Sequence, residues 1–353
     1  MDLIQGIIST ILKAFQAERS IYGVYHLLKG KKSAQTIQDG TFFSALSYFG
    51  IFPFMHRSDI EKAVAALVYQ RDAIQKDDDR ALLTEQGLGK LKKFHEERPY
   101  LDDLQGWQYL AYSDPFWLRL CLFLQALTHL VEGSHAFYPI THQTQIQNWV
   151  KQHLPRSKEK RREQLTMIHD ELVRFLSTCW NEQAVIFVHQ LSGKKVTGYT
   201  KQQLADQMNM HVIEIHLIHL ATLHKLFNVL ENKQHQFPVL SLFIADLKQE
   251  LPLTESAKQT FSMLNKGASI EEISIERKLK RNTIEDHVVE IALQQPHFQI
   301  HSFVSKEVEL AILSLAQTVK TTRLRELKEK LPSNVSYFMI RLVLAREKVK
   351  HET

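Results

Sequence analysis

Apolar residues recur at helical spacing along almost the whole chain, and this pattern is the feature that most constrains the fold. Near the amino terminus, Ile4, Ile7, Ile8, Ile11 and Leu12 fall on the i, i+3, i+4 and i+7 positions of one helical face. Only 12 glycines and 9 prolines are available to interrupt helices among 353 residues. We therefore predict an all-α protein made of several helical modules.

The chain is long enough for two or three domains. We expect a tentative winged-helix-like unit in residues 1–96, a helical middle region in 97–250 and a C-terminal helical module in 256–350. In the first unit, an acidic turn at residues 76–80 leads into Leu83-Thr84-x-x-Gly87 and a closing helix. That order is typical of a winged helix, in which a hairpin of two short strands precedes the last helix.

The formal net charge of +5 is unevenly distributed. Residues 256–353 hold 16 Lys and Arg against 12 Asp and Glu, whereas residues 1–255 hold 28 against 27. A local excess of positive charge indicates an anionic partner such as nucleic acid. A second basic run, residues 156–162, is interpreted as a linker or an exposed helix start. The densest C-terminal cluster comprises Arg277, Lys278, Lys280 and Arg281.

The C-terminal module contains a sharp pattern of helix ends. Gly267 is predicted to end one helix, and Ser269 with Glu272 forms a capping box that starts the next. After a tight turn, a third helix opens at Arg281 or Asn282. This tri-helical arrangement is the one in which a third helix meets DNA with its first residues. Ile284 and Val288 are predicted to face the core, and Thr283, Glu285, Asp286 and His287 to lie nearer solvent.

The run GASIEEISIERKLKRNTIEDHV, followed by KLPSNVSYFMIRLVLA, is similar to the helicase helix-turn-helix domain family over about residues 256–346. That module occurs at the C-terminus of many RecQ-type helicases. It also occurs in a free-standing Gram-positive bacterial protein encoded beside a RecQ-type helicase that lacks it. The resemblance implies an accessory protein that docks a RecQ-type helicase and contacts DNA weakly, preferring DNA structure to sequence. The candidate DNA-binding residues are Arg277, Lys278, Lys280, Arg281, Asn282, Thr283 and His287.

Other interpretations of this module stay open. A tri-helical module can bind protein alone or be purely structural, and a basic cluster can be a solvated helix end. A sequence-specific transcriptional regulator and a scaffold that binds only protein are the alternative functions, and the oligomeric state is open. Basic residues of the tail extend the positive surface or pair with Glu326 and Glu329; they are Arg323, Arg325, Lys328, Arg341 and Arg346.

Residues 101–150 contain a single basic residue, Arg119, and three of the four tryptophans. Because a phosphate backbone requires cations, we interpret this segment as a core or a protein-binding surface. Base stacking is a further alternative. A helix-turn-helix spacing at residues 199–223 is interpreted as structural. The candidate partner-binding residues are Trp107, Tyr109, Tyr112 and Trp117.

No motif for catalysis or metal binding is complete. Residues 30–33 lack the spacing of a phosphate-binding loop, and the two cysteines have no partner at zinc-ligand spacing. Four histidines, His211, His216, His219 and His224, are interpreted as members of a half-buried helix. We therefore expect a protein that is not an enzyme and needs no cofactor or metal.

The cellular location is predicted from the amino-terminal sequence and from the length of the most apolar run. The amino terminus has no basic export signal, and the apolar run 116–131 is shorter than a membrane span. We expect a cytoplasmic protein without a membrane contact, and nucleoid association is compatible with this.

Overall fold

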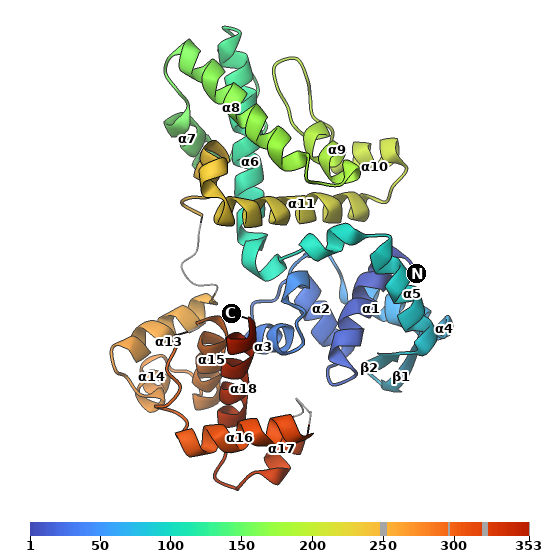
Figure 1. Cartoon of the computed structure of the whole chain (residues 1–353), viewed down its shortest axis with the longest axis vertical. Coiled ribbons are helices and arrows are strands. Elements are labelled where there is room, and N and C mark those ends of the chain that lie inside the picture. The colour runs from blue at the N-terminus through green and yellow to red at the C-terminus, as the bar shows by residue number, and fades with distance from the viewer. Residues whose placement is uncertain (248–252, 296, 320–323, 353) are drawn as a thin grey trace. The chain divides into compact units, whose positions relative to one another are not determined.

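The computed structural model describes residues 1–247, 253–295, 297–319 and 324–352 (Figure 1). Within these residues the chain is about 68% helical, with 18 α-helices and one two-stranded sheet, so the all-α prediction is confirmed. Two compact units are present. Residues 92–249 form one unit, and residues 2–91 together with 250–353 form the other.

The N-terminal segment combines helices with a small hairpin. Its hairpin strands pair antiparallel, with Ile74 opposite Leu82. Gly87 follows the hairpin, and a Cβ at this position would lie 2.0 Å from the carbonyl oxygen of Asp72. The predicted hairpin and closing helix are therefore confirmed. The elements are α1 (Leu3–Phe15), α2 (Ile21–Lys29), α3 (Ala34–Phe42), η1 (Leu46–Tyr48), α4 (Arg57–Tyr69), β1 (Ala73–Asp77), β2 (Arg80–Leu83) and α5 (Glu85–Glu96).

The C-terminal segment is built around α15. This helix packs against α13, α14 and α18 and also against α3 of the N-terminal segment. Its core includes Ile273, Ile284 and Val288, which are fully buried. Burial of such side chains supplies most of the stability of short helices. The elements are α13 (Glu255–Asn265), α14 (Ile270–Glu276), α15 (Arg281–Gln294), α16 (Lys306–Val319), α17 (Leu324–Lys330) and α18 (Tyr337–Glu352).

The middle unit packs helices around an aromatic core. Phe116, Phe123 and Phe227 are buried in it, and the ring centroids of Phe116 and Phe227 lie 5.1 Å apart. The apolar run 116–131 forms the second part of α6. The elements are η2 (Pro99–Asp103), α6 (Gly106–Val131), α7 (Thr144–His153), α8 (Lys158–Leu176), α9 (Asn181–His189), α10 (Lys201–Met208), α11 (Val212–Asn232), η3 (Gln234–Gln236) and α12 (Pro238–Leu242).

The second helix-turn-helix spacing forms α10 and α11. Thr200 caps α10 through a capping box with Gln203, and Asn209 ends it in the left-handed conformation. Most of α11 is buried in the core of the middle unit. The exposed residues of α11, Asn228 and Asn232, lie near its end, whereas a recognition helix meets DNA with its first residues, so the interpretation of this pair as structural agrees with its packing.

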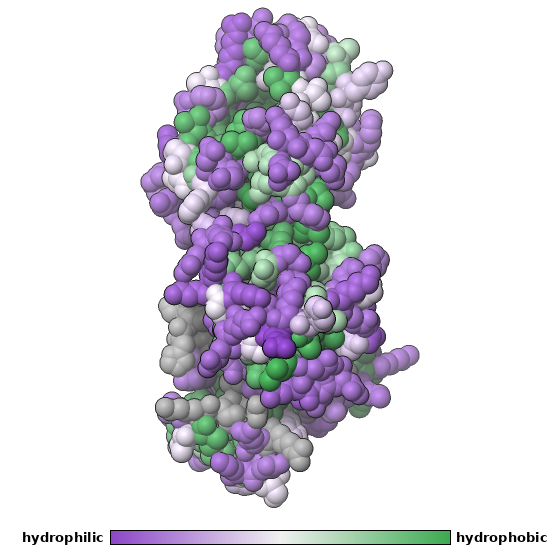
Figure 2. Space-filling model, turned by 90° about the vertical axis from the view of Figure 1, so that its right-hand side faces the viewer, coloured by the Kyte–Doolittle hydropathy of each residue, from purple (hydrophilic) through white to green (hydrophobic). Residues whose placement is uncertain are grey.

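Arg119, the single cation of residues 101–150, is buried. Its guanidinium donates two hydrogen bonds to the carboxylate of Asp246, at 2.6 and 2.8 Å, and lies 4.6 Å from the ring centroid of Trp149. The carboxylate of Asp246 therefore neutralises the positive charge of Arg119 within this unit. Hydrophilic residues cover most of the face seen in Figure 2, with apolar residues between them in small groups. Among the described helices, none is long and apolar enough to cross a membrane.

Candidate nucleic-acid interface

Three helices, α13 to α15, form the predicted tri-helical module. Gly267 adopts a φ of 88° after α13, a conformation that favours glycine. Ser269 then caps α14, accepting from the backbone N–H of Glu272 at 3.2 Å, while the Glu272 carboxylate accepts from the N–H of Ser269 at 2.7 Å. The backbone N–H of Ser269, together with its hydroxyl at 2.9 Å from the same carboxylate, lowers the pKa of Glu272. The predicted capping box and helix ends are confirmed.

The turn between α14 and α15 determines where the basic residues point. Lys278 adopts a φ of 52°, and its backbone ends α14 so that α15 begins at Arg281. The turn contains the cluster of four cations predicted to contact DNA. The structure gives these four residues different roles.

Arg277 forms internal hydrogen bonds to α13. Its guanidinium donates to the carbonyl oxygen of Ser256 at 2.8 Å, to Oε1 of Gln259 at 3.0 Å and to the hydroxyl of Thr260. Arg277 is half-buried and its donors are used within the module, which argues against the prediction that it contacts DNA. A guanidinium offers five donors, and here most of them are used to hold the end of α14 against α13.

His287 is buried, with 5% of its surface exposed. Its Nδ1 lies 2.9 Å from the hydroxyl of Thr260. Burial, reinforced by the charge of Arg277, lowers the pKa of His287 to about 4. The expectation that His287 lies near solvent and contacts DNA is wrong, because the helix turns this side chain toward α13.

Arg281 is exposed but paired with two carboxylates. Its Nε lies 2.9 Å from Oε1 of Glu285, and Nη1 contacts the carboxylate of Glu271. Two negative charges beside one guanidinium leave little net positive charge at this position. Arg281 therefore offers less to a phosphate than its place in the sequence indicates.

The remaining candidates form a small exposed group that we name the α15 turn: Lys278, Lys280, Asn282 and Thr283. The first three are exposed and Thr283 is half-buried. Among the described residues, Lys278 and Lys280 have no carboxylate within ion-pair distance. Lys280 also precedes the first turn of α15, where the helix dipole favours an anion.

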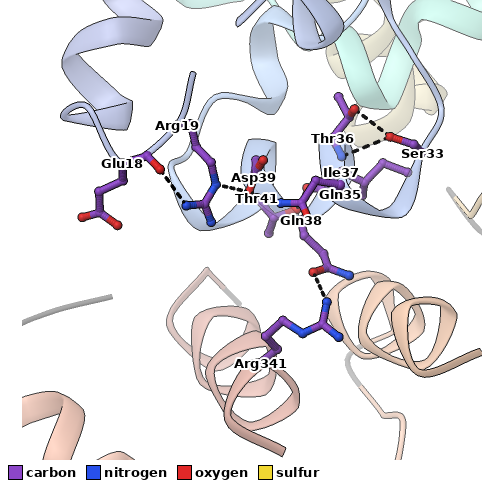
Figure 3. A network of polar contacts seen from close by, with 10 residues as sticks. All are labelled: Glu18, Arg19, Ser33, Gln35, Thr36, Ile37, Gln38, Asp39, Thr41 and Arg341. Carbon is purple, nitrogen blue, oxygen red and sulfur yellow. Dashed lines mark hydrogen bonds and ion pairs between the residues drawn. The ribbon is translucent and has the colours of Figure 1, made fainter. Parts of the chain in front are cut away.

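The rest of α15 is covered. Gln38 of α3, which is 2% exposed, donates to the carbonyl oxygen of Asp286 at 3.4 Å. Arg341 of α18 reaches the amide oxygen of Gln38 at 3.2 Å (Figure 3) and the carboxylate of Asp286 at 2.5 Å. Val289 and Ile291 are also buried, and Ile291 packs in a cluster with Leu253 and Ala257. The exposed residues of α15 are therefore Arg281 and Asn282, at its start, while Thr283, Glu285, Asp286 and Gln294 are half-buried.

The basic residues of the tail contribute little to the same surface. Arg341 is paired with Asp286, as described, and the ammonium of Lys328 donates to the carbonyl oxygen of Ser333 at 3.1 Å. A guanidinium nitrogen of Arg346 is buried. Arg323 and the side chain of Arg325 lie outside the described residues.

The four candidate partner-binding aromatics belong mostly to the core of the middle unit. Tyr109 and Tyr112 are buried, and the hydroxyl of Tyr109 donates to Oε2 of Glu231 at 2.8 Å. Trp117 is half-buried and packs edge-on against His219 at 4.5 Å. Packing buries the rings of Tyr109 and Tyr112, which argues against a partner contact for these two residues, whereas Trp117 keeps part of its surface open. Trp107 is half-buried and keeps part of its surface open.

Sequence reasoning missed Trp180, the tryptophan outside the aromatic segment. It lies just before α9 and is 56% exposed, the most of the four tryptophans. The signal in the sequence was its isolation: no apolar residue follows it at i+3 or i+4 except Ala184.

The histidines of α11 form hydrogen bonds with neighbouring groups, although Nε2 of His224 is buried without a partner among the described residues. His219 is hydrogen-bonded to Gln190 at 3.0 Å, and Nδ1 of His224 accepts from the N–H of Gln105 at 2.9 Å. Burial lowers the pKa of His219 and brings that of His224 to about 3. In the part of the chain that the structure describes, no three metal-ligating side chains gather.

Comparison with known proteins agrees with the geometry of the C-terminal module. A family model described as a helix-turn-helix domain matches residues 256–344, the segment that contains α13 to α15. This match supports DNA contact through the module. No solved structure matches the chain at a significant level. Protein YpbB of Bacillus subtilis (strain 168) is 34% identical over 331 residues, which cover 94% of this chain and 93% of that protein. The chain therefore belongs to the same family as Protein YpbB.

Proposed function

We propose that this protein is a non-enzymatic accessory factor that contacts DNA weakly through the α15 turn and docks a RecQ-type helicase. The observation that carries the DNA part is a contrast along one segment: Lys278 and Lys280, just before α15, are exposed and have no carboxylate partner among the described residues, whereas most of α15 after its first turn is buried. A contact limited to one turn reaches few phosphates. The affinity is therefore expected to be low and strongly dependent on salt.

The burial of most of α15 also affects whether the protein recognises DNA sequence or DNA structure. Sequence readout requires several side chains along a helix lying in the major groove. Here Asp286 and His287 are occupied by internal contacts, so readout of base edges is restricted to Asn282 and Thr283. We therefore favour recognition of DNA structure, such as forks and single-strand junctions, over a regulator that reads one operator.

The DNA contact is tested with a double substitution, Lys278→Ala and Lys280→Ala. Each phosphate that the protein no longer neutralises lowers the slope of log K against log salt by about 0.9, so the slope should fall by roughly two units in an anisotropy titration. The matched control is Lys92→Ala with Lys93→Ala, two exposed lysines of α5 paired with Glu96 and Glu97 at 3.9 and 3.8 Å. Equal slopes for both variants would contradict the α15 turn as a DNA site.

The helicase contact rests on the resemblance of residues 256–346 to the helicase helix-turn-helix family and on one exposed tryptophan of the middle unit, Trp180. Exposed tryptophans are frequent centres of protein interfaces, and Trp180 is the open one here. A pull-down from nuclease-treated extract should recover a RecQ-type helicase with the wild-type chain and with Tyr138→Ala, whose aromatic ring is 95% exposed. Trp180→Ala should abolish this recovery. Recovery of DNA without a helicase from a parallel extract that is not treated with nuclease would favour the regulator.

A further inference from the structure

A second basic region lies in the middle unit, where α7 ends and α8 begins. We name it the α8 basic cluster, and its members are Lys151, Arg156, Lys158, Lys160, Arg161 and Arg162. Residues 151–162 contain these six cations and a single carboxylate, Glu159. The resulting local charge of +5 equals the formal charge of the whole chain, so the rest of the protein is neutral on balance.

The cluster sits on an ordered helix start. Ser157 caps α8 by accepting from the backbone N–H of Lys160 at 3.2 Å. Nε of Arg161 donates to the carbonyl oxygen of Pro155 at 2.8 Å, which fixes the short connection from α7. Beneath the connection, Trp149 and Val150 are buried in the core. The cations are therefore presented by a defined backbone.

The members of the cluster are exposed and uncompensated. Lys151, Arg156, Lys158, Lys160 and Arg162 are exposed, and Arg161 is half-buried. None of the six has a carboxylate within 4.0 Å among the described residues, although Glu159 and Glu163 lie on the same helix. Lys158 and Arg162 are i, i+4 neighbours, so their like charges repel in the free protein.

Several other cations of the same unit are paired with carboxylates, whereas Arg174, Lys201 and Lys233 have no ion pair among the described residues. The ion pairs join Arg98 to Glu214 at 2.9 Å, Arg119 to Asp246 at 2.6 Å, Lys194 and Lys195 to Glu132 at 3.1 and 3.3 Å, and Lys225 to Asp103 at 3.7 Å. The middle unit thus neutralises its positive charge at many positions and leaves it free at the start of α8. A concentration of free cations at a helix start, where the dipole is also positive, creates a site for an anion.

We propose that the α8 basic cluster binds the phosphodiester backbone of DNA, independently of base sequence. DNA fits better than an acidic protein or a membrane because the apolar residues of this stretch, Leu154 and Pro155, are half-buried. Amphipathic membrane helices require exposed apolar side chains beside the charges, and protein interfaces are usually enriched in aromatic residues and Met at their centre. The helix-turn-helix match supports DNA as a ligand of the same chain. The cluster itself is a separate site from the α15 turn.

The test uses a double substitution in the full-length chain, Lys158→Ala with Arg162→Ala. It removes two positive charges from one face of α8. Alanine is favourable in helices, so α8 should persist, as circular dichroism can verify. The matched control is Lys194→Ala with Lys195→Ala, which also removes two cations from the middle unit, but cations paired with Glu132. Binding of a duplex and of a single strand of equal length is measured by anisotropy over a range of salt concentrations.

The cluster variant should lower the salt slope by about 1.8 units for duplex DNA or about 1.4 units for single strands, and the control should not. The form of DNA that shows the decrease identifies the source of the phosphates. The same decrease is expected in a Lys278→Ala, Lys280→Ala background, so failure of the α15 turn as a site does not obscure the result. An unchanged slope with both forms of DNA would overturn the proposal. So would absence of wild-type binding at low salt, or preferential binding of poly-glutamate.

Discussion

The protein has two basic clusters that look alike in the sequence and differ in the structure. In the C-terminal turn, the guanidinium of Arg277 donates its hydrogen bonds to α13. Arg281 forms ion pairs with Glu271 and Glu285. At the start of α8, by contrast, five of six cations are exposed and none has a carboxylate partner in the described chain. Charge density in the sequence therefore does not measure the positive charge that a ligand meets. Partners close in space, including residues distant in sequence, determine it.

The largest expected effect concerns Arg277. Substitution by alanine removes its hydrogen bonds to Ser256, Gln259 and Thr260 and should destabilise the C-terminal module by about 2–3 kcal/mol. Removal of the exposed cation Arg162 should change stability by less than about 0.5 kcal/mol. Hydrogen exchange of the amides of α13 and α8 measures both effects. Equal, small effects would show that Arg277 is as free as the cations of α8.

The next effect is the acid sensitivity of the C-terminal module. The pKa of His287 is about 4 in the folded protein, against an ordinary value near 6.5, so the unfolded chain binds the proton more tightly. The stability due to neutral His287 is complete above about pH 6.5 and is lost as the pH falls toward 4. By pH 4.5 the loss should be about 2–3 kcal/mol.

The matched variant for this test is His287→Gln, whose amide can still bond to the hydroxyl of Thr260. Opening free energies of α15 from hydrogen exchange at pH 7.5 and 4.5 should differ less in the variant than in the wild type. Identical pH dependence in the two proteins would mean that His287 titrates normally and is not held beside Arg277.

A smaller effect should appear when Arg281 is released from its carboxylates. The double substitution Glu271→Gln with Glu285→Gln removes both partners, so one further cation becomes available and the DNA salt slope should steepen by about one unit. Glu276→Gln is the control, because it removes an exposed negative charge from α14. If the control steepens the slope equally, the pairing of Arg281 does not limit its contact with DNA.

The smallest effect is expected at Lys278. Its φ of 52° is unfavourable for a side chain with a Cβ, so Lys278→Gly should leave stability unchanged or raise it by up to about 1 kcal/mol. The DNA salt slope should nevertheless fall by about 0.9. A loss of stability like that at the adjacent Arg277 would contradict the separation of roles within this turn.

Sequence reasoning succeeded where local rules determine the structure. The capping box of Ser269 and Glu272, the end of α13 at Gly267 and the start of α15 at Arg281 depend on residues a few positions apart. The hairpin before Gly87 is local in the same sense. Helical spacing also identified Ile284 and Val288 as core residues.

It failed where distant residues decide the outcome. The pattern predicted that His287 faces solvent, but its side chain is hydrogen-bonded to Thr260 of α13. In addition, Gln38 of α3 packs on α15 and donates to the carbonyl oxygen of Asp286. Likewise, Tyr109 and Tyr112 have the composition of an interface, yet α11 supplies Phe227 to bury both rings. No spacing rule within α6 or α15 contains these partners, since they belong to other helices.

The central claim is that DNA meets the exposed cations of the α15 turn and the α8 basic cluster, and not the paired ones. The most direct measurement is the salt dependence of DNA binding for a combined variant carrying Lys158→Ala, Arg162→Ala, Lys278→Ala and Lys280→Ala. Its slope should be lower than that of the wild type by roughly 3.6 units on duplex DNA, the sum of four phosphate contacts. A combined variant that keeps the wild-type slope would contradict the claim.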